Sequence, residues 1–189
     1  MTAQDASQRR DRALLLIGDA IKNAGAALIV GNGDLSRRVG NLLEDVPAIL
    51  LEGAMGMSAA VAVGFNRFSN LPTVVIEGDG NRILGSPAAE WLATSNLKVL
   101  HVVFANHMHA SSGGQPVALD LSLTGPSVYR VEIHDLAGIA DVLSLWSEGT
   151  LPVQLTITET VDSLDLPPRP QRSIESQANA LQQYTLGLR

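Results

Sequence analysis

Oxygen-bearing side chains follow two buried segments of this sequence. Asp79 lies in the turn Gly78-Asp79-Gly80, and Asn106 follows an apolar run. Roughly 25 residues separate Gly80 from Asn106, about the length of one helix and one strand, so both side chains are expected at neighbouring strand ends. Two such oxygens, phosphate oxygens and a backbone carbonyl would make the octahedral shell that Mg²⁺ prefers. Taken alone, an Asp-Gly turn is more often a plain structural turn than a ligand site.

Periodic apolar residues place these turns in an alternating pattern of helices and strands. The pattern predicts strands at 27–30, 48–51, 73–76, 98–104, 128–133 and 153–158, and helices at 13–21, 34–44, 57–68, 87–95 and 136–146. Strands that are continuously apolar and alternate with helices indicate an α/β fold with a parallel sheet covered on both faces. Ligands bind such sheets at the carboxyl ends of the strands, here at 31–34, 53–56 and 78–81.

The sequence changes character near residue 163. Residues 1–162 are expected to form one domain of ordinary size. Residues 163–189 read as a stiff Pro-rich linker, Leu166-Pro167-Pro168-Arg169-Pro170, and a polar tail that is either partner-binding or partly disordered. A long polar loop is expected from Asn106 to about Ser122.

Composition excludes several classes of protein. The net charge is −6 with scattered basic residues, which argues against a nucleic-acid partner. The absence of cysteine excludes disulfides, thiolate nucleophiles and iron–sulfur ligation by this chain. The polar N-terminus resembles no signal peptide and no apolar run could span a membrane, so a cytoplasmic protein is expected. The hydrophobic fraction of 46% with 17% charged residues favours oligomer contacts.

The turn at 78–80 and Asn106 together resemble the fingerprint of thiamine-diphosphate enzymes, a GDG followed at this distance by an Asn. The resemblance implies thiamine diphosphate and Mg²⁺ as cofactors. It also implies Asp79 and Asn106 as side-chain ligands of the metal, Met108 as a main-chain ligand, and Gly78, Gly80 and Asn81 at the cofactor. Two positions depart from the pattern: Asn81 stands where a Ser usually follows, and Ala105 where a second Asn often precedes.

A second segment, residues 51–60, looks like the glycine-rich turn and small-residue helix of phosphonopyruvate and sulfopyruvate decarboxylases. By this resemblance the carbonyl of Gly53 accepts from the cofactor's aminopyrimidine, and Met55 wedges between the two cofactor rings. The wedge bends the cofactor so that its own amino group acts as a base. The alternative for Met55 is ordinary core filling.

The stretch from Asn106 to Pro116 is similar to the same decarboxylases, in which Asn, His, Ser and a GGQP tetrad recur at these spacings. The resemblance implies that His109 meets an anionic substrate group, whereas His107 points to solvent; a surface role for His109 is the alternative. Relatives also carry a glycine followed by Ser-Arg at the position of Gly33 and Ser36, where backbone amides and the Ser36 hydroxyl could cradle the diphosphate. Arg37 either joins this cradle or is a solvated helix charge.

The family requires a glutamate on a pyrimidine-binding domain, and only about 25 residues precede the first expected strand. Neither Glu52 nor Glu77 occupies the family's position. A pyrimidine-binding partner chain is therefore expected to supply the glutamate in a hetero-oligomer, as in the split form of sulfopyruvate decarboxylase.

The implied reaction is decarboxylation of a small anionic 2-oxo acid to an aldehyde. Carboligation and a noncatalytic scaffold remain alternatives. A ferredoxin-coupled oxidoreductase chain would need cysteines, and a nicotinamide enzyme a GxGxxG turn.

Overall fold

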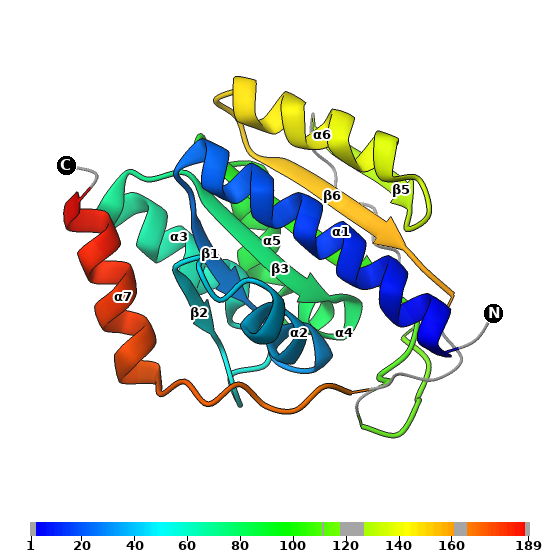
Figure 1. Ribbon diagram of the computed structural model, residues 1–189. Coiled ribbons are helices and arrows are strands. Elements are labelled where there is room, and N and C mark those ends of the chain that lie inside the picture. The colour runs from blue at the N-terminus through cyan, green and yellow to red at the C-terminus, as the bar shows by residue number, and fades with distance from the viewer. Residues whose placement is uncertain (1–2, 111, 118–126, 161–165, 188–189) are drawn as a thin grey trace.

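The sheet of this protein contains six parallel strands in the order β2-β1-β3-β4-β6-β5. The computed structural model describes residues 3–110, 112–117, 127–160 and 166–187 (Figure 1). The strands are β1 (Ala27–Val30), β2 (Ala48–Leu50), β3 (Thr73–Gly78), β4 (Val99–Ala105), β5 (Val128–Glu132) and β6 (Val153–Thr158). The helices are α1 (Ala3–Ala24), α2 (Asp34–Leu42), α3 (Ser58–Ser69), α4 (Asp79–Leu84), α5 (Ser86–Ala93), α6 (Leu136–Glu148) and α7 (Ile174–Gly187).

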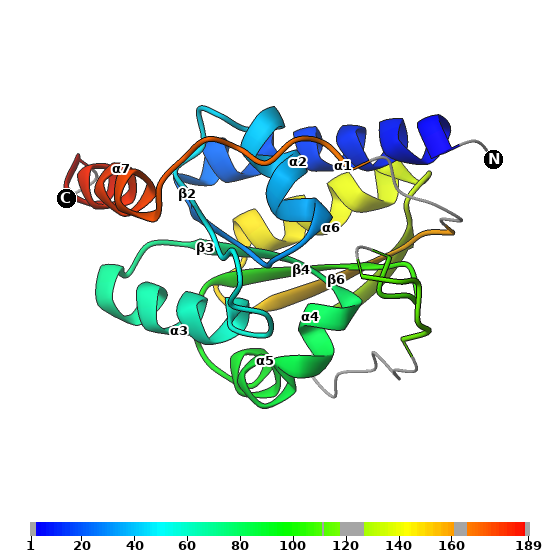
Figure 2. The same ribbon diagram turned by 90° about the horizontal axis from the view of Figure 1, so that it is seen from below.

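Helices cover both faces of the sheet (Figure 2). α1, α2 and α6 lie on one face, and their apolar stripes pack on β-strand residues in the larger core cluster, which includes Leu14, Ile17, Leu100 and Trp146. α3 and α5 lie on the other face over a smaller cluster that includes Ala62 and Val75. Burial on both faces explains why the central strands are continuously apolar rather than alternating.

All six strands run in the same direction, so their carboxyl ends meet at one edge of the sheet. β1 pairs with β2 on one side and with β3 on the other, and the chain therefore leaves the sheet in opposite directions after β1 and after β3. A crevice opens at such a switch point because consecutive connections diverge. The turns after β1, β2, β3 and β4 all end beside this crevice.

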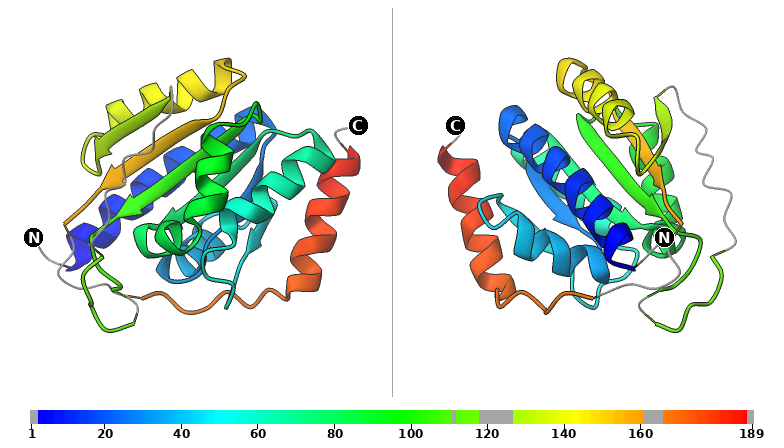
Figure 3. Two further views of the ribbon diagram at one scale, coloured as in Figure 1. Left: turned by 180° about the vertical axis from the view of Figure 1, so that it is seen from behind. Right: turned by 45° about the vertical axis from the view of Figure 1, so that its right-hand side comes forward.

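The C-terminal arm, residues 166–187, packs along the outside of α2 and the edge of the sheet (Figures 1 and 3). Arg37 donates to the carbonyl of Pro167 at 3.3 Å, and Asn41 to that of Pro168 at 3.1 Å. A Cβ on Gly40 would lie 2.1 Å from Cγ of Pro170, so the glycine allows the arm to approach α2. α7 then lies beside β2, whose Leu50 amide donates to Oε1 of Gln177 at 2.7 Å. The arm thus covers the otherwise open β2 edge.

The structure confirms the predicted α/β fold and every strand and helix expected from the sequence, with boundaries shifted by a few residues everywhere except at the start of α1. α1 begins ten residues earlier than Ala13, where its polar residues hide the periodicity. Two helices were not predicted: α4, which looked like a turn, and α7, in the polar tail. The domain limit at residue 162 lies outside the described residues, and a partner role for the tail stays a prediction. No helix in the described ranges is long and apolar enough to cross a membrane.

The contact of α7 with β2 predicts a measurable contribution to stability. Gln177→Met should lower the free energy of unfolding by about 1–3 kcal/mol, because the buried Leu50 amide loses its acceptor. Gln182→Met, at an exposed position of the same helix, is the matched control and should change stability by less than about 0.5 kcal/mol. Denaturant unfolding measures both. Equal stabilities for the two variants would contradict docking of α7 on β2.

Candidate functional site

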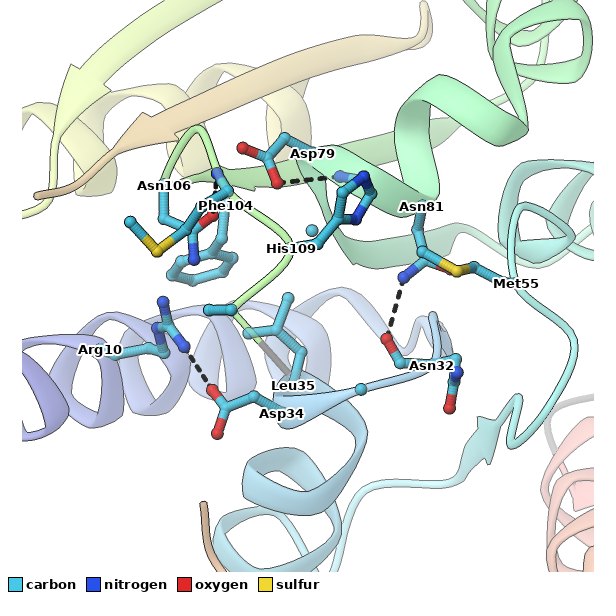
Figure 4. A pocket seen from close by; sticks show the side chains of 15 residues that line it. Arg10, Asn32, Asp34, Leu35, Met55, Asp79, Asn81, Phe104, Asn106 and His109 are labelled. Carbon is cyan, nitrogen blue, oxygen red and sulfur yellow. Dashed lines mark hydrogen bonds and ion pairs between the residues drawn. The ribbon is translucent and has the colours of Figure 1, made fainter. Parts of the chain in front are cut away.

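A pocket of about 70 Å³ lies at the carboxyl edge of the sheet, where the turns after β1 to β4 converge (Figure 4). It is lined by Arg10, Asn32, Gly33, Asp34, Leu35, Met55, Gly78, Asp79, Gly80, Asn81, Phe104, Asn106, Met108, His109 and Ala110. Met55 and Asn81 lie on one side of it, and Arg10 and Phe104 on the other. Nine of the predicted site residues are among those that line it, so the structure brings the three sequence motifs into one place.

Asp79 is the first residue of α4 and is 3% exposed. Its Oδ1 accepts from the backbone N–H of Gly80 at 2.8 Å, and its Oδ2 from that of His107 at 2.6 Å. Burial raises the pKa of Asp79 above the ordinary value of an aspartate, and the amides of His107 and Gly80 oppose this shift. The second hydrogen bond fixes the turn after β4 against the turn after β3.

Asn106 follows β4 and lines the same pocket as Asp79. Its Oδ1 accepts from the backbone N–H of Met108 at 3.1 Å, which leaves this oxygen a further lone pair. Carboxylate and amide oxygens from adjacent strand ends therefore face one small volume, as the spacing predicted. Ala105, one of the two departures from the family pattern, is fully buried in β4 and is not among the described lining residues, so it leaves the pocket wall unchanged.

Gly80 lies beneath His109 and Met55. A Cβ at residue 80 would be 2.6 Å from Nδ1 of His109 and 3.5 Å from Cε of Met55, so a larger residue there would displace the His109 ring from its present position. His109 is placed by a compact turn in which its N–H donates to Gln115 at 2.8 Å and its carbonyl accepts from Gly114 at 3.0 Å. His107 is exposed, as expected. Met55 is 41% exposed at the pocket rim rather than buried as core filling.

The turn after β1 brings the start of α2 to the pocket. Gly33 has φ of 113°, a conformation that favours glycine, and lines the pocket. The buried Ser36 hydroxyl donates to the carbonyl of Gly33 at 2.8 Å, within its own helical turn. Ser36 and Gly53 are not among the described lining residues, and their cofactor contacts stay predictions. Arg37 contacts the C-terminal arm, which neither sequence-based alternative anticipated.

A buried charge network that the sequence did not predict lies at the opposite wall of the pocket. Arg10 of α1 forms ion pairs with Asp34 of α2 and with Glu159 after β6. Arg38 also pairs with Asp34, at 2.8 Å, and with Asp11, at 2.9 Å. Burial works against the charge of Arg10, but Glu159 and Asp34 outweigh it and raise its pKa above the ordinary value. The network joins α1, α2 and the end of β6 around the pocket.

A helical stripe in the sequence could have revealed Arg10. Residues 10, 14, 17 and 21 recur at helical spacing, and the last three belong to the predicted apolar face. An arginine on that stripe must be buried with a counter-charge, because an unpaired buried charge is costly.

A second buried cluster lies under the pocket floor. Glu77 of β3 accepts from the hydroxyl of Ser58, the first residue of α3, and its Oε1 lies 2.7 Å from Nε2 of His101. All three residues are at most 1% exposed. The cluster holds the start of α3 on the sheet, and through it the turn that carries Met55. Glu77 is thus hydrogen-bonded inside the protein and is not among the described residues that line the pocket.

Comparison with known proteins gives a family match over half of the chain. Residues 45–146 match the model described as "Thiamine pyrophosphate enzyme, C-terminal TPP binding domain". Phosphonopyruvate decarboxylase of Streptomyces viridochromogenes is 32% identical over 154 residues, which are 75% of this chain and 38% of that protein. Phosphonopyruvate decarboxylase of Streptomyces hygroscopicus is 30% identical over 122 residues, 62% of this chain and 30% of that protein. The chain spans well under half the length of these curated relatives.

Solved structures share the fold at low sequence identity. A 2-oxoglutarate:ferredoxin oxidoreductase from Magnetococcus marinus matches 82% of this chain and 63% of its own, with a TM-score of 0.63 and 17% identity. Benzoylformate decarboxylase from Polynucleobacter necessarius matches 82% of this chain and 34% of its own, with a TM-score of 0.60 and 15% identity. At these identities the matches show the α/β fold alone.

The charge network predicts a strong dependence of stability on Arg10. Arg10→Met should lower the free energy of unfolding by about 3–5 kcal/mol, because Asp34 and Glu159 would lose a buried partner. Arg9→Met, at the exposed neighbouring position of α1, is the control and should stay within about 0.5 kcal/mol of the wild type. Chemical denaturation followed by circular dichroism checks this, and a loss below about 1 kcal/mol for Arg10→Met would contradict a buried network.

Proposed function

Because this chain belongs to the thiamine pyrophosphate enzymes, as their C-terminal TPP-binding domain, we propose that it is the diphosphate- and magnesium-binding subunit of a thiamine-diphosphate-dependent 2-oxo acid decarboxylase. The observation that carries this proposal is the convergence of Asp79, Asn106, Met55 and His109 on one pocket at the sheet's switch point. The similarity to phosphonopyruvate decarboxylases over 75% of the chain supports decarboxylation and a small anionic substrate.

The oxygen donors of the pocket suit Mg²⁺. Asp79 and Asn106 would supply side-chain oxygens and Met108 its carbonyl, while phosphate oxygens and water would complete a six-coordinate shell. Among the described residues no group of three or more His, Cys, Asp and Glu side chains could hold a metal, so an all-protein cage for a softer metal has no support. A single protein carboxylate neutralises one of the cation's two positive charges and leaves the other for a polyanionic ligand, as a diphosphate site requires.

The diphosphate would be held by the backbone rather than by cationic side chains. The turn at Gly33 and the first turn of α2 lie at the pocket, and a helix N-terminus favours an anion. Arg10 also lines the pocket, but Asp34 and Glu159 already pair with it. Affinity for a diphosphate is therefore expected to depend on Mg²⁺ more than on any one arginine.

Met55 and His109 stand where they would act on cofactor and substrate. Bound thiamine diphosphate supplies an electron sink for the carbon–carbon bond that breaks when a 2-oxo acid loses carbon dioxide. Met55, exposed at the rim above Gly80, would support the bent form of the cofactor by packing between its rings. His109 lies over the same glycine and would donate a hydrogen bond to an anionic group of the substrate.

The pocket of this chain is incomplete as an active site, which supports a partner. No described glutamate lines it: Glu77 is bound to Ser58 and His101, and Glu159 to Arg10. The volume of about 70 Å³ is also small beside the roughly 300–1,000 Å³ typical of small-molecule sites. We therefore propose that a pyrimidine-binding partner carries the glutamate and closes the site in a hetero-oligomer. Carboligation by the same assembly and a noncatalytic scaffold are the competing functions.

Calorimetric titration of thiamine diphosphate and MgCl₂ into the chain, alone and with a pyrimidine-domain protein encoded beside it, tests the proposal. Binding should be at least about tenfold tighter with the partner, because the partner encloses the exposed half of the cofactor. The reconstituted complex should then release carbon dioxide from phosphonopyruvate, sulfopyruvate or a related 2-oxo acid. Binding without carbon dioxide release, but with condensation to an added aldehyde, would favour carboligation. Partner binding that needs no cofactor and gives no turnover would favour the scaffold.

Replacement of Asp79 tests the metal site. Asp79→Asn keeps the size of the side chain but removes its charge, so Mg²⁺-dependent cofactor binding should fall by at least about a hundredfold, or about 2.7 kcal/mol. Asp141→Asn, at an exposed position of α6, is the charge-matched control and should bind like the wild type. Isothermal calorimetry with and without Mg²⁺ is the measurement. Unchanged, Mg²⁺-dependent affinity in Asp79→Asn would reject Asp79 as a ligand.

A further inference from the structure

Asn81 connects two turns that are distant in the sequence. Its Nδ2 donates to the carbonyl of Asn32 in the turn after β1, at 2.9 Å. Its Oδ1 accepts from the backbone N–H of Gly56 in the turn after β2, at 3.1 Å. Figure 4 shows the side chain between Asn32 and Met55. Because a carbonyl can only accept and a backbone N–H can only donate, one orientation of the amide satisfies both contacts.

The backbone around Asn81 is packed as closely as these hydrogen bonds require. A Cβ on Gly31 would lie 3.3 Å from Cγ of Asn81 and 2.9 Å from Cβ of Glu77. A Cβ on Gly56, whose φ is 80°, would lie 2.8 Å from Cβ of Leu84. Glycines thus let both turns approach α4 closely enough for one short side chain to reach them. Asn81 is 5% exposed, so water does not readily replace either contact.

The residue type at position 81 matters for this connection. In thiamine-diphosphate enzymes a serine usually stands at this position. Its one oxygen lies a single bond beyond Cβ and cannot reach both turns. An asparagine presents a donor and an acceptor on opposite sides of a planar group. The departure from the family pattern at residue 81 therefore has a structural explanation in this chain.

We propose that Asn81 is a positioning residue, whose side-chain amide holds the Asn32 and Met55 turns in one fixed relation before any cofactor binds. The inference rests on the proposed function, because it states how the two walls of that cofactor pocket are preset. The side chain is hydrogen-bonded to both turns, and it acts on the cofactor by holding Met55 and Gly33 in place. A preset pocket binds more tightly because less conformational entropy is lost on binding.

Hydrogen exchange in the cofactor-free chain tests the positioning directly. In Asn81→Ser the Gly56 amide loses its acceptor and should exchange at least about tenfold faster by NMR than in the wild type, since its hydrogen bond is the local barrier to opening. Asn81→Asp keeps an acceptor for Gly56 but loses the donor to Asn32. It should preserve slow exchange at Gly56 while the carbonyl ¹³C shift of Asn32 changes. Unchanged exchange at Gly56 in Asn81→Ser would overturn the proposal.

Cofactor titration of the same variants tests whether the two Asn81 hydrogen bonds affect binding. Serine and asparagine are both uncharged. A fall of about tenfold in the affinity of Asn81→Ser for thiamine diphosphate with Mg²⁺ would therefore reflect the loosened turns and not a change of charge. Asn23→Ser and Asn23→Asp, exposed on α1, are the matched controls and should leave both Gly56 exchange and affinity unchanged. Weaker binding without faster exchange at Gly56 would mean that the side chain contacts the cofactor directly, which overturns positioning.

Hydrogen exchange and cofactor titration together distinguish failure of this inference from failure of the proposed function. If the wild-type chain, with or without its partner, binds no thiamine diphosphate, the proposed function fails, and Gly56 exchange still decides whether Asn81 holds the turns. If Asn81→Ser unfolds, which circular dichroism reveals, Asn81→Asp carries the test through the Asn32 carbonyl shift and Gly56 exchange. Faster exchange combined with unchanged cofactor affinity would reject a role for the turns in binding.

Discussion

The site depends on the short segment from Gly78 to Asn81, whose side chains hydrogen-bond to the turns after three other strands. Asp79 accepts from His107 after β4, and Asn81 holds Asn32 after β1 and Gly56 after β2. Parallel strands bring these turns to one edge of the sheet, but sheet geometry alone leaves their loops free to move. The two side chains convert nearness into a fixed arrangement. A carboxylate and an amide next to two glycines can do this because the backbone can approach them closely.

The opposite wall of the pocket is held by charge rather than by turns. Arg10, Asp34, Arg38 and Glu159 are all buried, which would be costly for any of them alone. Each arginine has carboxylate partners, and the pocket lining includes Arg10 of α1 and Asp34 of α2. The network therefore fixes α1 against the start of α2. It also pairs the arginines near the pocket with carboxylates. An incoming anion would therefore meet backbone N–H groups and the proposed Mg²⁺ rather than an unpaired arginine.

The sequence predicted the fold and most of the pocket because both are encoded locally. Continuous apolar runs identify buried parallel strands, and glycine-rich turns mark their ends, so Gly78, Asp79 and Asn106 could be placed beside one another from spacing alone. Arg10 and Glu159 could not, because they are 149 residues apart and their pairing depends on how α1 crosses the sheet. α7 was missed for a related reason. Its polar sequence shows little periodicity, and its burial depends on the free edge of β2.

The rigidity of this pocket and its proposed completion by a partner have separate origins. The groups that would hold a metal and a diphosphate belong to turns connected by hydrogen bonds within this chain. The described glutamates that are buried, by contrast, are bound inside the protein, and Met55 stays 41% exposed at the rim. Proton transfer needs a group whose pKa responds to the reacting atoms, whereas cofactor binding needs groups that do not move. Dividing these tasks between this chain and a second surface would let the cofactor half remain preformed while the catalytic environment is completed only on assembly.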